Sequence, residues 1–204
     1  MANRIVCIAE GKGEVEAVPN LCARILAYLG SHNWFVDSHV IRLPRSLLVD
    51  ESTPSPDRSA NVNGVQRAVS YAALRGADAM LILADADDDC AAAWSESIAG
   101  LRSPGPPVAA VMAVREFEAW LLSNRSTEEL EQARIANPET VRDAKGRMRS
   151  FVAKYKPTVH QLEETRRIDI ERVRTVSPSF DKLVRSIAIL CNLADRRRTS
   201  DPSS

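Results

Sequence analysis

The sequence predicts an α/β protein with a mainly parallel sheet and helices on both faces. Short apolar runs, typical of buried strands, alternate over the first two-thirds of the chain with segments whose apolar residues recur every three or four positions. Such an alternation of strand and helix is typical of parallel sheets with helical crossovers. Beyond Asn124 the strand patterns stop and only helical patterns continue.

Each element of the core follows from a local pattern. Strands are predicted at residues 5–9, 34–43, 79–84 and 107–114. Helices are predicted between the turn at residues 11–13 and Gly30, over 61–75 up to Gly76, over 91–101, and through Phe117 to Leu122. The proline-rich segments 44–59 and 103–106 are predicted as a loop and a turn.

The last third of the chain is predicted to be helical. Ser126 and Glu129 have the spacing of a capping box, which opens a short helix. The final helix has one apolar stripe, formed by Phe180, Leu183, Val184, Ile187, Leu190 and Cys191. We therefore divide the chain into an α/β core over residues 1–124, a C-terminal helical extension packed on it over 125–194, and a disordered tail over 195–204.

Charge is balanced overall but not along the chain. The 204 residues contain 27 basic and 27 acidic side chains, so the total implies no partner. Residues 142–174 carry a net charge of +5, however, and residues 1–141 carry −7. This asymmetry suits a metal-dependent enzyme that acts on a polyanion. Solvated helix faces are the alternative explanation.

The cysteines and the apolar runs bear on the compartment. The four cysteines, Cys7, Cys22, Cys90 and Cys191, form no CxxC pair, which argues against a zinc site and a disulfide framework. No apolar stretch approaches the roughly 20 residues of a membrane span. The sequence therefore predicts a cytoplasmic protein without a membrane partner.

An acidic run follows the third predicted strand. Asp85, Asp87, Asp88 and Asp89 come directly after the apolar residues 79–84. Asp85 and Asp87 have the alternate spacing that points two side chains to one side of extended backbone, whereas Asp88 or Asp89 can cap the next helix. Crowded carboxylates repel one another unless a cation neutralises them.

A second acidic turn follows the first predicted strand and contains Glu10 and Glu14. Glu14 also suits the first turn of a helix, but the helix dipole does not explain Glu10, which ends the strand. Since ligands bind at the carboxyl ends of parallel strands, the two acidic turns predict one site for Mg²⁺ or Mn²⁺.

Five further side chains are candidates for the same site. Glu118 and Arg115 follow the fourth strand; Glu118 can reach the same edge of the sheet or be a solvated helix residue, and Arg115 can contact a phosphate or pair with an acid. Lys154 and Lys156 flank a tyrosine, a weak signal for nucleic-acid binding. His160 is either a general base, a phosphate ligand or a solvated histidine.

These elements together resemble a known domain. A Glu-Gly turn after strand one, an Asp-x-Asp after strand three and an α/β core resemble the TOPRIM domain of topoisomerases, primases and OLD-family nucleases. The segments 10–14, 115–122 and 177–183 are similar to a bacterial family of TOPRIM-like proteins of unassigned function, often encoded beside SMC- or ABC-like ATPases in defence-type loci. The glycine that often follows the Asp-x-Asp of TOPRIM domains is replaced here by Asp88.

The resemblance implies a TOPRIM-like fold and roles for particular residues. Glu10, Asp85 and Asp87 match the acids that surround Mg²⁺ in TOPRIM domains, and Glu118 matches the acid of the Phe-Glu-x-Trp segment. The first hypothesis is a Mg²⁺-dependent nuclease of an anti-phage defence system, acting on DNA or RNA through metal-activated water. Its metal ligands would be Glu10, Glu14, Asp85 and Asp87, its catalytic residues Glu10, Asp85, Asp87 and Glu118, and its nucleic-acid contacts Arg115, Lys154, Lys156 and His160.

The second hypothesis is a non-catalytic TOPRIM-like subunit that binds an SMC- or ABC-like ATPase and docks or senses nucleic acid. A homodimer remains open under both hypotheses. A receiver-like or phosphatase-like domain is the third hypothesis, and the glutamate at position 10 argues against it, because those domains usually place aspartates after the first strand.

Overall fold

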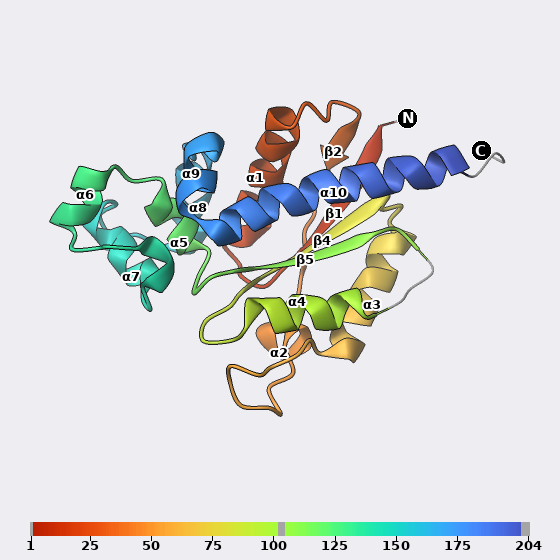
Figure 1. Ribbon diagram of the computed structural model, residues 1–204, viewed down its shortest axis with the longest axis horizontal. Helices are drawn as coiled ribbons and strands as arrows, with labels where there is room; N and C mark the ends of the chain where they lie inside the picture. Colours follow the sequence, from red (N-terminus) through yellow and green to blue (C-terminus); the bar gives the residue numbers. More distant parts are fainter. Residues whose placement is uncertain (1, 102–104, 201–204) are drawn as a thin grey trace.

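The computed structural model describes residues 2–101 and 105–200 and confirms the α/β class. Helices and strands alternate up to the fifth strand and only helices follow, as Figure 1 shows. The elements are β1 (Asn3–Ala9), α1 (Glu14–Tyr28), β2 (Trp34–Val36), β3 (Ile41–Arg42), α2 (Arg45–Leu48), α3 (Val62–Leu74), β4 (Ala79–Asp85), α4 (Ala91–Ala99), β5 (Val108–Ala113), α5 (Glu118–Ser123), α6 (Thr127–Gln132), η1 (Pro138–Thr140), α7 (Ala144–Arg147), η2 (Met148–Ser150), α8 (Pro157–Arg166), α9 (Ile170–Val176) and α10 (Pro178–Ser200).

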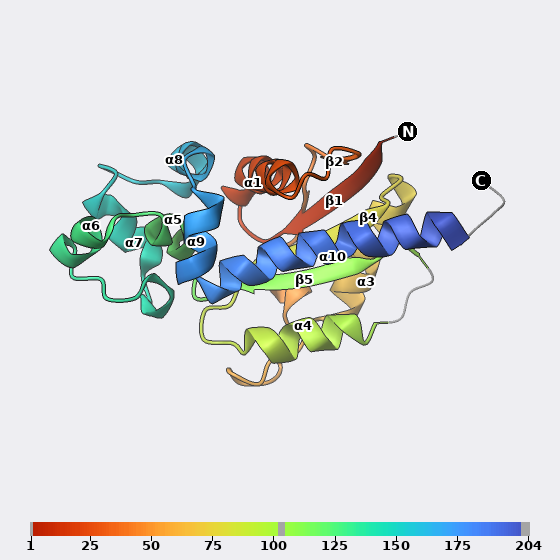
Figure 2. The same cartoon turned by 45° about the horizontal axis from the view of Figure 1, so that its top comes forward.

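All strand pairs of the sheet are parallel. The order is β2-β1-β4-β5, and β3 pairs with β1 further along the same edge as β2. Helices α1 and α10 cover one face of the sheet, while α3 and α4 cover the other (Figure 2). Helices α5 to α9 lie beyond the carboxyl ends of the strands, opposite the chain termini (Figure 1).

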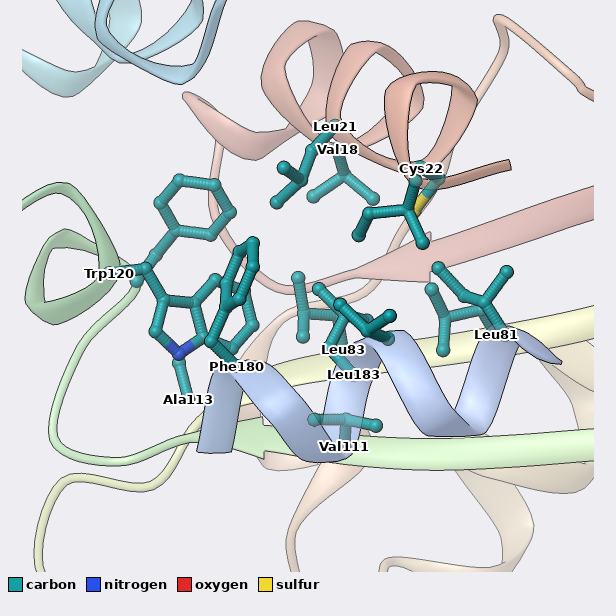
Figure 3. Packing of buried hydrophobic residues seen from close by; sticks show 14 of the residues in the cluster. Val18, Leu21, Cys22, Leu81, Leu83, Val111, Ala113, Trp120, Phe180 and Leu183 are labelled. Atoms are coloured by element: carbon teal, nitrogen blue, oxygen red, sulfur yellow. The ribbon is translucent and has the colours of Figure 1, made fainter. Parts of the chain in front are cut away.

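The alternation of side chains along the strands builds the core on both faces. In β4, Leu81 and Leu83 join the cluster beneath α1 and α10, whereas Ile82 joins the cluster beneath α3 and α4. Every residue of β4 is buried, as expected for a central parallel strand. Figure 3 shows Trp120 and Phe180 side by side at the end of the first cluster, with ring centroids 5.5 Å apart. That cluster also extends into the helices beyond residue 124.

The strand predicted over residues 34–43 is not continuous. Residues 34–43 form two short strands, β2 and β3, separated by a turn. The turn arises because the carboxylate of Asp37 accepts a hydrogen bond from the backbone N–H of His39 (2.9 Å), which takes the chain out of the extended conformation. The predicted loop at residues 44–59 also contains a helix, α2, whose Leu48 is fully buried.

The predicted disordered tail begins at Asp195, within the bounds of helix α10. Helix α10 continues through Ser200, because Ala194 is buried and Asp195 accepts a hydrogen bond from the amide of Asn3 (3.0 Å). Residues 201–204 lie outside the described part of the chain. The capping box is confirmed, with Ser126 and Glu129 each accepting a hydrogen bond from the other's backbone N–H.

Cys7 and Cys22 are buried in the core. No helix within residues 2–101 and 105–200 is long and apolar enough to cross a membrane. The predicted turn at residues 103–106 lies partly outside the described residues.

Candidate functional site

Acidic side chains follow three neighbouring strands of the sheet. Glu10 directly follows β1, Asp85 is the last residue of β4, and Glu116 and Glu118 follow β5. Because β1, β4 and β5 are adjacent and parallel, their carboxyl ends meet at one edge. The structure therefore places the predicted acids Glu10, Asp85 and Glu118 at the same end of the sheet.

Glycines allow the first turn to pack closely into this edge. The Glu14 carboxylate folds back over the turn and accepts a hydrogen bond from the backbone N–H of Gly11 (3.2 Å). A Cβ at Gly11 would collide with that carboxylate, and a Cβ at Gly13 would collide with the side chain of Gln161. Glu14 is buried as a result.

Asp85 connects three elements that are far apart in the sequence. Its Oδ1 accepts a hydrogen bond from the backbone N–H of Phe117 (2.7 Å), at the start of α5. Its Oδ2 accepts one from Nζ of Lys145 on α7 (3.4 Å). Lys145 also lies 3.5 Å from Oε1 of Glu116, whose Oε2 accepts a hydrogen bond from the backbone N–H of Lys145 (2.9 Å).

Glu118 is fully buried and only half satisfied. Its Oε1 accepts hydrogen bonds from the hydroxyl of Tyr155 (3.1 Å) and the amide of Gln161 (3.5 Å). Its Oε2 has no hydrogen-bond partner among the described residues, and neither has Oε1 of Gln161. An orphaned carboxylate oxygen costs free energy in the folded state, so a site that keeps one is a candidate to bind a ligand.

Burial and mutual repulsion raise the pKa values of these acids. Burial raises the pKa of Asp85 to about 6, against the partly offsetting charge of Lys145. Burial likewise raises the pKa of Glu118 to about 7, and burial together with the negative charge of Asp85 raises the pKa of Glu14 to about 8. The pKa of Glu10 is also raised, chiefly by burial, although Arg45 opposes this.

Arg45 on α2 neutralises the other side of the cluster. Its Nη1 lies 3.5 Å from the Glu10 carboxylate and 3.3 Å from that of Asp87, and it donates to the backbone carbonyl of Asp85 (2.8 Å). Its Nη2 contacts the buried carboxylate of Asp89. Arg45 thus contacts the carboxylates of Glu10 and Asp87, whereas it reaches Asp85 only at the backbone carbonyl.

The side chain of Asp87 departs from the expected geometry. Extended backbone ends at Asp85, and Asp87 adopts a positive φ of 49°. Asp87 is therefore half exposed while Asp85 is buried, and the two side chains do not share the surroundings that alternate spacing predicts. Asp89 does not cap α4, because no side chain caps the helix that begins after Cys90.

The donor set suits a hard cation, although the acids are held apart. No group of three His, Cys, Asp or Glu side chains in residues 2–101 and 105–200 is arranged to hold a metal ion as it stands. The groups that converge are nevertheless carboxylate oxygens, the ligands that Mg²⁺ and Mn²⁺ prefer, and one buried oxygen of Glu118 is unpartnered. The residues present therefore fit a divalent cation, provided that Lys145 and Arg45 give up some of their contacts.

The predicted basic residues have different positions. Arg115 contacts the Asp88 carboxylate, and exposed Arg142 lies 3.1 Å from the same carboxylate, so both lie beside the acidic cluster. Lys154 and Lys156 are exposed on the segment that leads into α8. His160 has a local role: its Nδ1 accepts a hydrogen bond from the backbone N–H of Lys156 (3.0 Å) at the start of α8.

Four residues of this site were not predicted from the sequence: Arg45, Lys145, Tyr155 and Gln161. The basic charge of residues 142–174 was the one signal that pointed to Lys145, and nothing local distinguishes it from its neighbours. The segments 115–122 and 177–183 also have structural roles. The indole of Trp120 donates to Oγ of Ser179 (2.8 Å), and Ser179 donates to the carboxylate of Glu139.

Comparison with known proteins identifies the family of the chain. No curated protein and no solved structure matches it significantly. One family model, described as "Domain of unknown function (DUF4276)", matches residues 9–188, a range that contains the whole acidic cluster. The chain belongs to this family.

Proposed function

We propose that this protein is a Mg²⁺-dependent phosphodiesterase, a nuclease of the TOPRIM type that acts in a bacterial defence system. The observation that carries the proposal is the buried cluster of Asp85, Glu14 and Glu118, whose pKa values are raised because burial and repulsion exceed the available positive charge. Proteins rarely keep such groups together unless they serve a ligand or a reaction. The resemblance of Glu10, Asp85 and Asp87 to the acids of TOPRIM domains supports the same proposal.

The residues of the cluster would act together. Glu10, Asp85 and Asp87, helped by Glu14 or Glu118, would hold one or two cations. When bound, Mg²⁺ would neutralise charge on the phosphate and activate water. Arg115 and Arg142, which now contact Asp88, would pair with neighbouring phosphates of the polyanion.

The direct test is cleavage by the purified protein. Labelled single- and double-stranded DNA and RNA are incubated with the protein in millimolar Mg²⁺ or Mn²⁺, and product is measured over time. We expect cleavage that EDTA abolishes and that Glu10→Gln reduces strongly. Glu16→Gln is the matched control, because Glu16 is exposed on α1 two residues after buried Glu14. Equal activity of Glu10→Gln and wild type would refute the proposed site.

One observation favours a second function. Lys145 and Arg45 already neutralise part of the cluster without a metal, which also suits a non-catalytic TOPRIM-like subunit that docks nucleic acid for an SMC- or ABC-like ATPase. Under this alternative the purified protein would bind oligonucleotides but show neither cleavage nor a rise of melting temperature with Mn²⁺. Metal binding by the isolated chain therefore separates the two functions.

A further inference from the structure

Lys145 is the one lysine that contacts the acidic cluster among the described residues. Its ammonium lies 3.4 Å from Oδ2 of Asp85 and 3.5 Å from Oε1 of Glu116. The other oxygen of Asp85 is already bound by the backbone N–H of Phe117. Lys145 therefore holds the Asp85 oxygen that a metal ion would need.

The backbone of Lys145 is held by hydrogen bonds and burial, whereas its side chain is partly exposed. Its backbone N–H donates to Glu116 (2.9 Å), Ala144 beside it is fully buried, and Asp143 caps the same helix by accepting from the N–H of Gly146 (2.8 Å). The Lys145 side chain, by contrast, is 44% exposed. The ammonium can thus leave Asp85 and stay close to the site without any movement of α7.

The charge of the cluster favours such an exchange. The ammonium of Lys145 faces the carboxylates of both Asp85 and Glu116. One positive charge does not balance these acids. A divalent cation brings twice the charge, and a bound phosphodiester then supplies a new negative partner for the displaced ammonium.

We propose that Lys145 and a divalent cation exchange at Asp85, and that the displaced ammonium becomes a catalytic contact to the scissile phosphate. This inference rests on the proposed function. In the metal-free protein Lys145 acts as a counter-ion to Asp85. In the loaded protein it donates hydrogen bonds to a non-bridging phosphate oxygen; it forms and breaks no covalent bond and transfers no proton.

The first test is metal binding without substrate. Mn²⁺ is titrated calorimetrically into wild type, Lys145→Met and Arg147→Met, the last being a control for loss of a positive charge on the exposed side of α7. We expect Lys145→Met to bind Mn²⁺ on the order of three- to tenfold more tightly than wild type, because the competing ammonium is gone. Arg147→Met should bind as wild type does.

The second test is cleavage by the same proteins. Lys145→Met should lower kcat by about a hundredfold despite its tighter metal binding, since a group that stabilises charge in the transition state is lost. Lys145→Arg should restore part of kcat. A lysine with a merely structural role would not produce tighter metal binding together with reduced cleavage. If Lys145→Met folds poorly, Lys145→Gln is tested in its place, once its melting transition is shown to match that of wild type.

The outcomes separate this inference from the proposed function. If wild type binds Mn²⁺ and cleaves but Lys145→Met is indistinguishable from it, the exchange is refuted and the nuclease stands. If metal affinity falls in Lys145→Met, Lys145 supports the site rather than competing for it, and the exchange is also refuted. If wild type neither binds metal nor cleaves, both proposals fail.

Discussion

Carboxylates in two clusters near opposite ends of β1 have pKa shifts of opposite direction. At the amino end, Asp37 is surrounded by partners: Nη2 of Arg75 at 2.8 Å, Nη1 of Arg4 at 3.9 Å and the backbone N–H of His39. Burial alone would raise the pKa of Asp37, but these partners lower it below its ordinary value. At the carboxyl end, the pKa values of Asp85, Glu14 and Glu118 are raised.

Asp37 has its charge compensated by neighbouring basic groups, whereas the charges of Asp85, Glu14 and Glu118 are compensated only in part, as the proposed ligand site requires. The carboxylate of Asp37 links the turn after β2 to Arg75, the residue that follows α3. The guanidinium of Arg75 compensates its negative charge. The acids at the other end are brought together by the topology of the sheet, and Lys145 and Arg45 compensate only part of their charge. Opposite responses of the two clusters to substitution, pH and metal would establish this distinction.

The largest contrast is expected between Asp85→Asn and Asp37→Asn. If the cluster binds Mg²⁺, Asp85→Asn should reduce cleavage by about a thousandfold and weaken the rise of melting temperature with Mn²⁺, while leaving metal-free stability unchanged or higher because repulsion is relieved. Asp37→Asn should do the reverse: lower the free energy of unfolding by about 1–3 kcal/mol and leave the metal response intact. Thermal melts with and without Mn²⁺, together with a cleavage assay, measure both.

Similar changes of stability and metal response in Asp85→Asn and Asp37→Asn would show that the two clusters do not differ in this way. In particular, if Mn²⁺ raised the melting temperature of Asp85→Asn as much as that of wild type, the metal would not bind at this edge of the sheet.

The second contrast concerns pH. In the metal-free protein, Asp85, Glu118 and Glu14 have folded-state pKa values of about 6, 7 and 8, above their ordinary values of 3.8, 4.5 and 4.5. The folded state therefore binds protons that the unfolded state releases, so the free energy of unfolding should fall as pH rises from about 4 to 8 and then level off. We expect a loss of at least about 2 kcal/mol, measured by urea denaturation in EDTA.

Asp37 has the opposite sign. Its lowered pKa gives stability that is present above the ordinary value of 3.8 and is lost as pH falls below it. The fall between pH 4 and 8 should therefore shrink in Asp85→Asn and persist in Asp37→Asn. Unfolding free energies independent of pH over this window would show that the cluster is not as crowded as the structure indicates.

The sequence could predict which strands bring the acids of this site together, but not which basic residues neutralise them. Apolar runs located β1, β4 and β5, and their parallel order brought Glu10, Asp85 and Glu118 to one edge. Arg45 and Lys145 could not be predicted, because each reaches the cluster from a short helix about 40 to 60 residues away from Asp85, and no local pattern encodes such contacts. The side-chain direction predicted for Asp87 assumed extended backbone. Its positive φ ends that extended conformation, so Asp85 and Asp87 do not share the same surroundings.

The third prediction tests a further acid that the fold satisfies. Glu139 accepts hydrogen bonds from the hydroxyl of Ser177 and from both the hydroxyl and the backbone N–H of Ser179, at the start of α10. If Glu139 stabilises the fold as Asp37 does, Glu139→Gln should lower the free energy of unfolding by about 1–3 kcal/mol without changing the Mn²⁺ response. Glu131→Gln, at an exposed position on α6, is the control. A lost metal response in Glu139→Gln would mean that the two classes of acid are coupled.

The smallest effect is expected from the exposed lysines that flank Tyr155. The hydroxyl of Tyr155 donates to Glu118, so Lys154 and Lys156 lie next to a residue of the cluster while their own side chains are exposed. If they contact phosphates, Lys154→Ala combined with Lys156→Ala should weaken binding of any oligonucleotide and flatten the slope of log affinity against log salt by up to about one unit per lost contact. The assay is a salt titration in Ca²⁺, chosen to support binding without cleavage.

Arg115→Ala with Arg142→Ala sharpens the same measurement. Both arginines contact Asp88 beside the cluster, so their loss should flatten the slope at least as much as the loss of the lysines if the polyanion passes over the unsatisfied acids. An unchanged slope in the lysine variant with a flattened slope in the arginine variant would place the substrate path on the Asp88 side. Unchanged slopes in both variants would show that neither pair of basic residues contacts the polyanion.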